Sequence, residues 1–124
     1  MMGPHKNLDV WRKSMILCDE IYRVSKSYPK DELFGLVSQM RRAAVSIPSN
    51  IAEGYGRSTN AEVIHFLYNS LGSSNELDTQ ILISKSQNYL TDEDFTKIDN
   101  LNGDVNKMLH SLIYKRSQVN TVKP

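Results

Sequence analysis

Apolar residues recur every three or four positions along most of the chain, which is the spacing of one face of an α-helix. In the first run, one stripe consists of Leu8, Trp11, Met15, Cys18 and Tyr22. A parallel stripe consists of Val10, Leu17, Ile21, Val24 and Tyr28. Together they predict a helix of about five turns with a broad buried face, ended by Pro29.

A second run begins at Asp31 and keeps its phase across Pro48. Its apolar positions are Leu33, Val37, Met40, Ala44, Ile47, Ile51 and Tyr55. A new helix starting at Pro48 would keep that phase only by coincidence, so the pattern favours one helix that bends where Pro48 lacks a hydrogen bond to Ala44. Asn50 and Glu53 offer a competing interpretation, because they have the form of a capping box that would begin a new helix. Gly56 is the expected C-cap.

Capping signals delimit two further helices. Thr59 and Glu62 form a capping box, which predicts a third helix that runs to about Gln87. Thr91, followed by three acidic residues, predicts a fourth helix that runs to about Arg116.

The short connections predict antiparallel packing of consecutive helices. No stretch alternates between apolar and polar residues, so we expect no strand. The predicted fold is all-α: an antiparallel up-down-up-down four-helix bundle that forms a single domain over residues 1–124, with short flexible segments at 1–7 and 117–124. The core is expected to include Trp11, Met15, Tyr22, Leu33, Met40, Ile47, Leu67, Leu71, Ile98, Val105 and Leu112.

Composition adds a constraint on partners. The 124 residues are 40 % hydrophobic and 23 % charged with a net charge of +1, as in an ordinary globular protein without an overall field for nucleic acid or membranes. The charge is uneven, however: residues 1–60 carry nine basic and six acidic groups, residues 61–110 three and eight, and residues 111–124 three and none. An anion-binding surface should therefore use the first half or the tail. No apolar run of about 18 residues and no signal-peptide core occur, so we expect a cytoplasmic protein, most simply bacterial, without membrane association.

Residues that could carry chemistry are scattered. Cys18 is the single cysteine and lies on an apolar stripe, where a small buried side chain is expected rather than a nucleophile. His5, His65 and His110 have no carboxylate or cysteine at metal-ligand spacing, and the one Glu-x-x-His match, at Glu62 to His65, lacks the second motif that a di-metal bundle needs. We therefore expect no enzyme, no metal and no cofactor.

Small polar residues line the side of the second helix opposite its apolar stripe, and the third helix carries a similar strip. A solvated face is the simplest interpretation, yet hydroxyls rather than long lysines and glutamates would let another helix approach closely. The candidate subunit-interface residues are Ser46, Ser49, Glu53, Ser70, Ser73 and Ser74.

Some basic residues have an acidic residue four positions before them, namely Lys13, Arg23 and Arg57, and are expected to form surface ion pairs with Asp9, Asp19 and Glu53. Others have no acid three or four residues away. These candidate RNA contacts are Arg41, Arg42, Lys115 and Arg116.

The stretch from Gln39 to Arg57, QMRRAAVSIPSNIAEGYGR, resembles the signature of the bacterial four-helix bundle proteins encoded in 23S rRNA intervening sequences. Val10-Trp11 with Lys13, Pro29 with Glu32 and Gly35-Leu36, and the stretch GSSNELDT at 72–79 are similar as well. The likeness spans roughly residues 7 to 116.

The resemblance implies a closed homo-oligomer, usually a pentamer, of antiparallel bundles. The same family includes strongly basic accessory proteins of diversity-generating retroelements, which bind a reverse transcriptase and nucleic acid; the near-neutral charge of this chain departs from them. Our first hypothesis is a non-enzymatic, oligomeric protein associated with structured RNA or a ribonucleoprotein. The alternative is a protein-only oligomeric scaffold or adaptor, such as a reverse-transcriptase accessory protein, without direct RNA contact.

Overall fold

A computed structural model describes residues 3–121, with side chains as far as residue 118. Its four long helices are α1 (Asp9–Ser25), α2 (Ser38–Tyr55), α3 (Asn60–Ser86) and α4 (Asp92–Thr121). Shorter helical turns are η1 (Pro4–Asn7), η2 (Lys30–Glu32) and the π-helical η3 (Leu33–Val37). The part of the chain described contains no strand.

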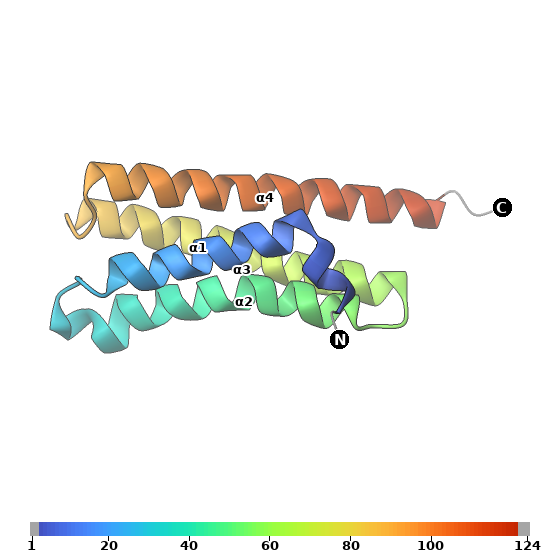
Figure 1. Ribbon diagram of the computed structural model, residues 1–124, viewed down its shortest axis with the longest axis horizontal. Helices are drawn as coiled ribbons and strands as arrows, with labels where there is room; N and C mark the ends of the chain where they lie inside the picture. Colours follow the sequence, from blue (N-terminus) through green and yellow to red (C-terminus); the bar gives the residue numbers. More distant parts are fainter. Residues whose placement is uncertain (1–2, 122–124) are drawn as a thin grey trace.

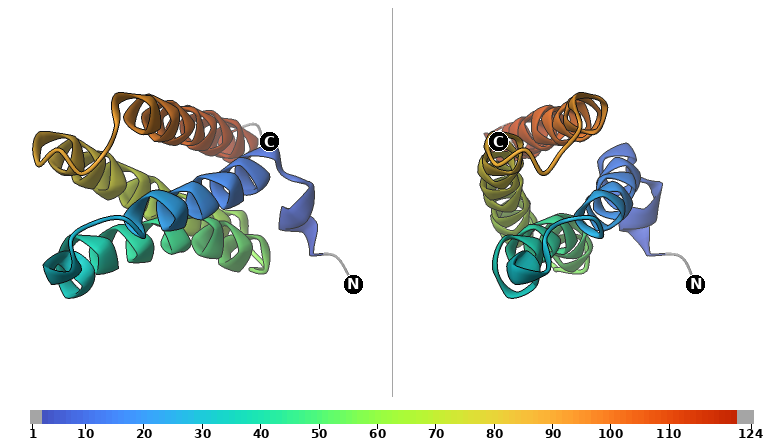
Figure 2. Two further views of the ribbon diagram at one scale, coloured as in Figure 1. Left: turned by 60° about the vertical axis from the view of Figure 1, so that its left-hand side comes forward. Right: turned by 90° about the vertical axis from the view of Figure 1, so that its left-hand side faces the viewer.

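The helices pack as a ring of four, in which α1 contacts α2 and α4, and α3 contacts α2 and α4. Consecutive helices run in opposite directions, and the end-on view shows the four around a shared centre (Figures 1 and 2). The predicted all-α four-helix bundle is confirmed. In Figure 1 the C-terminal part of α4 extends past the start of α1.

Pro48 lies inside α2, which continues without interruption from Ser38 to Tyr55. The Asn50 side chain donates from Nδ2 to the backbone oxygen of Ser46 and to its Oγ, both at 2.9 Å, so Asn50 is not the cap of a new helix. The competing capping-box interpretation is therefore wrong, and the helix is continuous as predicted. The bend at Pro48 stays a prediction.

The predicted caps of the last two helices are confirmed. Thr59 Oγ1 accepts from the Glu62 backbone N–H at 3.2 Å, and its hydroxyl donates to Glu62 Oε1 at 2.9 Å. Thr91 Oγ1 accepts from the Asp94 N–H at 3.0 Å. Gly56 is the C-cap of α2 with a right-handed φ of −90°, so the left-handed freedom of glycine is not used there.

Some predicted boundaries differ from the structure. α2 begins at Ser38 rather than at Asp31, because the chain first makes the η2 and η3 turns. α4 continues five residues beyond Arg116, to Thr121, so residues 117–121 are helical rather than a tail. Residues 4–7 form η1; residues 1–2 and 122–124 of the predicted flexible segments lie outside the described residues.

The buried core follows one of the two stripes of the first helix. Met40, Ile47, Leu67, Leu71, Ile98 and Val105 are buried as predicted. α1, however, buries the parallel stripe of Val10, Leu17, Ile21 and Val24, together with Ser14. With α1 in this orientation, the other stripe, which includes Met15 and Tyr22, lies outside the core. Met15, Tyr22 and Leu33 are exposed and Trp11 and Leu112 are half-buried, so the core prediction is wrong for Met15, Tyr22 and Leu33.

α2 and α3 approach closely at Gly54. A Cβ atom at this position would lie 2.8 Å from Cβ of Phe66 and 3.3 Å from the backbone oxygen of Val63. Farther along the same contact, the Ser70 hydroxyl donates to the Ile47 backbone oxygen at 2.8 Å. The short distance between these two helices thus depends on small residues.

α3 and α4 share a buried polar cluster, consisting of Ser74, Asn102 and Asn106. The Ser74 hydroxyl donates to Asn102 Oδ1 at 2.9 Å, and Asn102 Nδ2 donates to the Ser74 backbone oxygen at 3.1 Å. Asn106 Nδ2 donates to Ser74 Oγ at 3.1 Å. Ser74 and Asn102 are almost completely buried, and their polar groups are paired with each other.

Lys13 and Arg23 pair with carboxylates of α4 instead of the acidic residues four positions before them. Lys13 pairs with Asp104 at 3.1 Å, not with Asp9. Arg23 pairs with Asp94 at 2.7 Å and with Glu20 at 2.9 Å, not with Asp19. These two predictions were wrong because α4 lies close enough to α1 to offer its own carboxylates. The predicted Glu53–Arg57 pair is confirmed at 2.6 Å.

Candidate interaction surface

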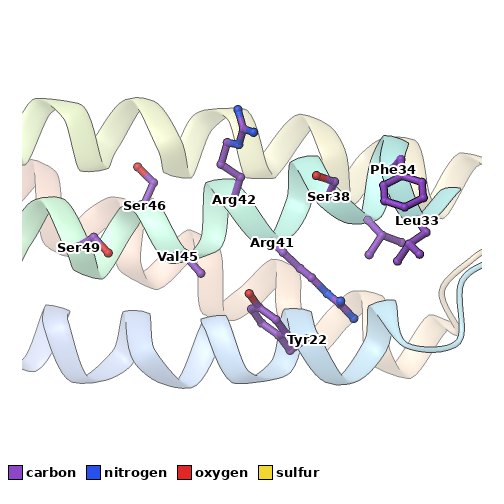
Figure 3. Close-up of a pocket in the computed structure, with 10 residues that line it drawn as sticks. Tyr22, Leu33, Phe34, Ser38, Arg41, Arg42, Val45, Ser46 and Ser49 are labelled. Atoms are coloured by element: carbon purple, nitrogen blue, oxygen red, sulfur yellow. The ribbon is translucent and has the colours of Figure 1, made fainter.

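The outer side of the bundle between α1 and α2 has a shallow groove, which we call the α1–α2 groove. Its larger part has a volume of about 660 Å³ and is lined by Tyr22, Leu33, Phe34, Val37, Ser38, Arg41, Arg42, Val45, Ser46 and Ser49 (Figure 3). A smaller part of about 370 Å³ is lined by His5, Trp11, Met15, Cys18, Val45, Pro48, Ser49 and Ala52. Val45 and Ser49 line both parts, so the groove is continuous along the two helices.

The η3 turn positions the most exposed apolar side chains. Gly35 departs from helical geometry with φ −113° and ψ −110°, and the Glu32 carboxylate accepts from the Leu36 N–H at 3.3 Å. This offset places Leu33 and Phe34 outside the face that α2 buries. Phe34 is 93 % exposed and Leu33 is 49 % exposed.

The stripe of α1 that the core does not use supplies the opposite wall. Because α1 buries Leu17 and Ile21, the Tyr22 and Met15 side chains turn toward α2 and remain exposed. The groove therefore includes Met15, Tyr22 and Leu33, three apolar positions that the sequence pattern assigned to the core. Sequence reasoning missed Phe34, although a signal existed: it stands beside the stripe through Leu33 and Val37 rather than on it.

The two arginines of the groove point in opposite directions (Figure 3). Arg41 extends toward α1, where its Nε donates to Ser25 Oγ at 2.9 Å and its guanidinium lies 4.7 Å from the centre of the Tyr22 ring. Arg42 is exposed and forms no ion pair within residues 3–118. Arg41 is thus held by α1, while Arg42 is available to a partner.

The four candidate RNA contacts do not form one cluster. Arg116, on α4, lies near the C-terminal end of α2. Its Nη1 donates to Asn60 Oδ1 at 2.7 Å, and its guanidinium lies 4.7 Å from the centre of the Tyr55 ring. Fourteen residues of helix separate Arg41 from Tyr55, which is about 21 Å. Lys115 is exposed beside Arg116. The prediction thus joined two separate surfaces, and Arg116 has a structural role within the subunit.

The candidate interface residues also divide into two groups. Ser70 and Ser74 are fully buried and hydrogen-bonded within the subunit, to Ile47 and Asn102, so their hydroxyls cannot face a partner. Ser70 and Ser74 are therefore removed from the candidate interface. Ser46 and Ser49 line the groove, and Ser73 donates to Ser46 Oγ at 2.8 Å next to it. Glu53 is exposed and paired with Arg57. An interface at these four residues stays a prediction.

Groups that could perform chemistry remain separate. Within residues 3–118 no three histidine, cysteine or acidic side chains come together as a metal site. Burial, and secondarily the neighbouring Asp19 carboxylate, raises the pKa of the Cys18 thiol, which keeps it in the less reactive neutral form. No helix in the described part of the chain is both long and apolar enough to cross a membrane.

The fold and the groove define the class as an all-α four-helix bundle with an apolar surface groove. Within that class, the chain belongs to the family of 23S rRNA-intervening sequence proteins, whose model matches residues 6–111. The bundle is similar to the crystal structure of a protein of unknown function of the S23 ribosomal protein family from Bacteroides thetaiotaomicron. The two share 28 % identity over 84 % of this chain and 97 % of that one, with a TM-score of 0.78. No functionally curated protein matches the chain.

Proposed function

We propose that this protein is a non-enzymatic bundle that works as a homo-oligomer, with the α1–α2 groove as a protein-contact surface. The observation that supports this best is the exposure of Phe34 and Leu33 at the end of a groove with further exposed apolar side chains. Fully burying an aromatic or aliphatic side chain is worth about 1.5–3 kcal/mol. Contiguous exposed apolar surface of this kind is typical of interaction sites.

The polar groups of the groove fit contact better than catalysis. Among the described residues that line its larger part, the polar side chains are hydroxyls and two arginines, with no carboxylate or imidazole to act as a general base. The small hydroxyls of Ser46 and Ser49 leave room for a helix to approach. A pentamer, expected from the family resemblance, is the assembly that we propose.

The test is the mass of the purified protein in solution at micromolar concentration, measured by light scattering. We expect a multiple of the subunit mass, and five subunits for the pentamer. The variant Phe34→Asp should shift the mass toward the monomer, because it places a charge in the apolar contact. Tyr114→Asp is the matched control, since Tyr114 is an exposed aromatic residue on α4 outside the groove. A wild-type monomer would refute the proposal.

Association with structured RNA is a second candidate function, favoured by basic residues at one end of the bundle. Lys26 and Lys30 are exposed, line a depression of about 240 Å³ together with Arg41, and form no ion pair within residues 3–118. Arg42 lies next to Arg41 in sequence. Because the family is described by the 23S rRNA intervening sequence, structured rRNA is the probe for this second function.

Changing Lys26, Lys30 and Arg42 together to glutamine tests this second function. RNA titrations at two salt concentrations should then show weaker binding, with the salt slope reduced by roughly one unit for each phosphate that the variant no longer neutralises. Lys107→Gln, which changes an exposed lysine farther along α4, is the control. If the RNA affinity and its salt slope were unchanged while the oligomer stayed intact, the protein-only scaffold would be the remaining hypothesis.

A further inference from the structure

Three exposed apolar side chains lie on α3, the helix across α2 from the groove. Tyr68 is 55 % exposed and Leu82 is 51 % exposed, and Ile83 beside them is exposed as well. The stripe along this side of α3, which we call the α3 stripe, consists of Tyr68, Gly72, Asn75, Thr79 and Leu82. None of these residues lines the α1–α2 groove.

Gly72 leaves the backbone of α3 uncovered near one end of the α3 stripe. A Cβ atom added there would meet nothing within 4 Å, so packing inside the subunit does not require glycine. A glycine within a helix is destabilising relative to alanine. Gly54 differs, because its Cβ would collide with Phe66 of the same chain. The open surface at Gly72, one turn from Tyr68, is instead accessible to a side chain from another molecule.

The two surfaces have opposite charge around them. The residues that line the α1–α2 groove include two arginines and no acidic residue, whereas α3 carries three acidic groups and one basic group, a net −2. Arg42 lies at the groove, and Glu76 and Asp78 flank the α3 stripe; all three are exposed and form no ion pair within residues 3–118. Contact between like surfaces would bring like charges together, whereas groove against stripe brings opposite charges together.

The two surfaces also match in length. The α3 stripe from Tyr68 to Leu82 spans fourteen residues, about 21 Å of helix. The larger part of the groove, from Phe34 to Ser49, spans fifteen residues, which is about 22 Å along η3 and α2. Phe34 lies at one end of the groove, and Gly72 lies near one end of the stripe.

We propose that the α1–α2 groove of one copy packs on the α3 stripe of the next copy, with Phe34 placed against the uncovered backbone at Gly72. This inference rests on the proposed homo-oligomer and specifies how its subunits meet. The contact joins two different surfaces, so it is head-to-tail: each copy uses its groove toward one neighbour and its stripe toward the other. Repeating this contact gives a closed ring if the rotation between neighbouring subunits divides a full turn evenly.

Two variants, each blocking one surface, test the pairing. Phe34→Asp blocks the groove and leaves the α3 stripe intact. Gly72→Arg blocks the stripe, and its side chain enters open space, so the subunit should keep its helical content in circular dichroism. Asn100→Arg, at an exposed position of α4, is the control for an added arginine and should keep the wild-type oligomeric state. Native mass spectrometry distinguishes the two variants by their different masses.

Each blocking variant alone should be a monomer, and an equimolar mixture should give a one-to-one heterodimer. The Phe34→Asp copy still offers its stripe to the intact groove of the Gly72→Arg copy, and no further contact can form. A wild-type monomer would overturn the proposed function and this inference together. A wild-type oligomer in which Gly72→Arg retains the full assembly would overturn the pairing alone. Two monomeric variants that do not combine would also overturn it, in favour of a contact between like surfaces.

Discussion

The close approach of α2 and α3 at Gly54 predicts that Gly54→Ala destabilises the protein. In most helices this substitution is favourable, because alanine restricts the unfolded chain and suits a helix. Here the added methyl group would lie 2.8 Å from Cβ of Phe66 and 3.3 Å from the oxygen of Val63. Both atoms belong to, or are attached directly to, the α3 backbone, so neither can swing away.

The magnitude follows from two opposing effects. Forcing one extra carbon into a packed contact typically costs about 1–3 kcal/mol. The gain in helix propensity is at most about 1 kcal/mol, and it is smaller here because Gly54 lies in the last turn of α2. We expect the free energy of unfolding to fall by about 1–2 kcal/mol. Gly103→Ala is the matched control, because a Cβ within α4 at that position meets nothing within 4 Å.

Urea unfolding followed by circular dichroism measures both variants, at one fixed protein concentration because oligomers unfold in a concentration-dependent way. Gly103→Ala should raise the free energy of unfolding by roughly 0.5–1 kcal/mol, while Gly54→Ala lowers it. If Gly54→Ala proved as stable as the wild type or more stable, while Gly103→Ala gained stability as expected, the reasoning about the close approach would be refuted.

Three further predictions concern the core, the ion pairs and the cysteine. Leu67→Ala should lower the free energy of unfolding by about 2–5 kcal/mol, because Leu67 is fully buried; a urea-measured decrease below about 0.5 kcal/mol would remove it from the core. Hydrogen bonds from Arg23 lower the pKa values of Glu20 and Asp94 in the folded protein. Their contribution is therefore complete above the unfolded pKa values, near pH 4, and is lost as the pH falls through the lower folded values. Arg23→Gln should flatten the fall in Tm below about pH 4, and an equal fall in both proteins would contradict this. The Cys18 thiol, with its raised pKa, should react with a thiol reagent at neutral pH more slowly than free cysteine, and an equal rate would count against its burial.

The elements of the bundle were predictable because their signals are local. The capping box at Thr59 and Glu62, the cap at Thr91 and the phase of the apolar stripe across Pro48 each involve residues within a few turns. The turns η2 and η3 before α2 were not predictable in the same way. The 4-3 spacing of Leu33, Val37 and Met40 continues through them, although Gly35 interrupts the helical geometry.

The buried face of α1 shows what a single sequence leaves open. Two adjacent stripes satisfy the helical period, and only the positions of the other helices decide which one is buried. The structure buries Leu17 and Ile21 and leaves Met15 and Tyr22 at the groove. Apolar residues near a bundle surface can therefore belong either to the core or to an interface, and periodicity alone does not separate these roles.

The candidate site was predictable in part. Ser46 and Ser49 do lie at the groove, because residues opposite an apolar stripe are expected at the surface. Ser70 and Ser74 were misplaced because a short hydroxyl can be buried when a neighbouring helix offers a partner, and that partner lies 23 and 28 residues away in sequence. Such distant pairing is not encoded in any local pattern.

The polar cluster between α3 and α4 determines how α4 is positioned along α3. Leucine and isoleucine side chains could still contact apolar neighbours if one helix slid along another by a turn, about 5.4 Å. The Asn102 amide and the Ser74 hydroxyl would then be separated inside the core, and an unpaired buried polar group costs about 1–3 kcal/mol. The axial position of α4 is therefore selected by a few directional bonds, while the apolar side chains supply most of the cohesion. In sequence evolution, this arrangement leaves the apolar positions free to exchange among similar shapes, as long as Ser74 and Asn102 change together or not at all.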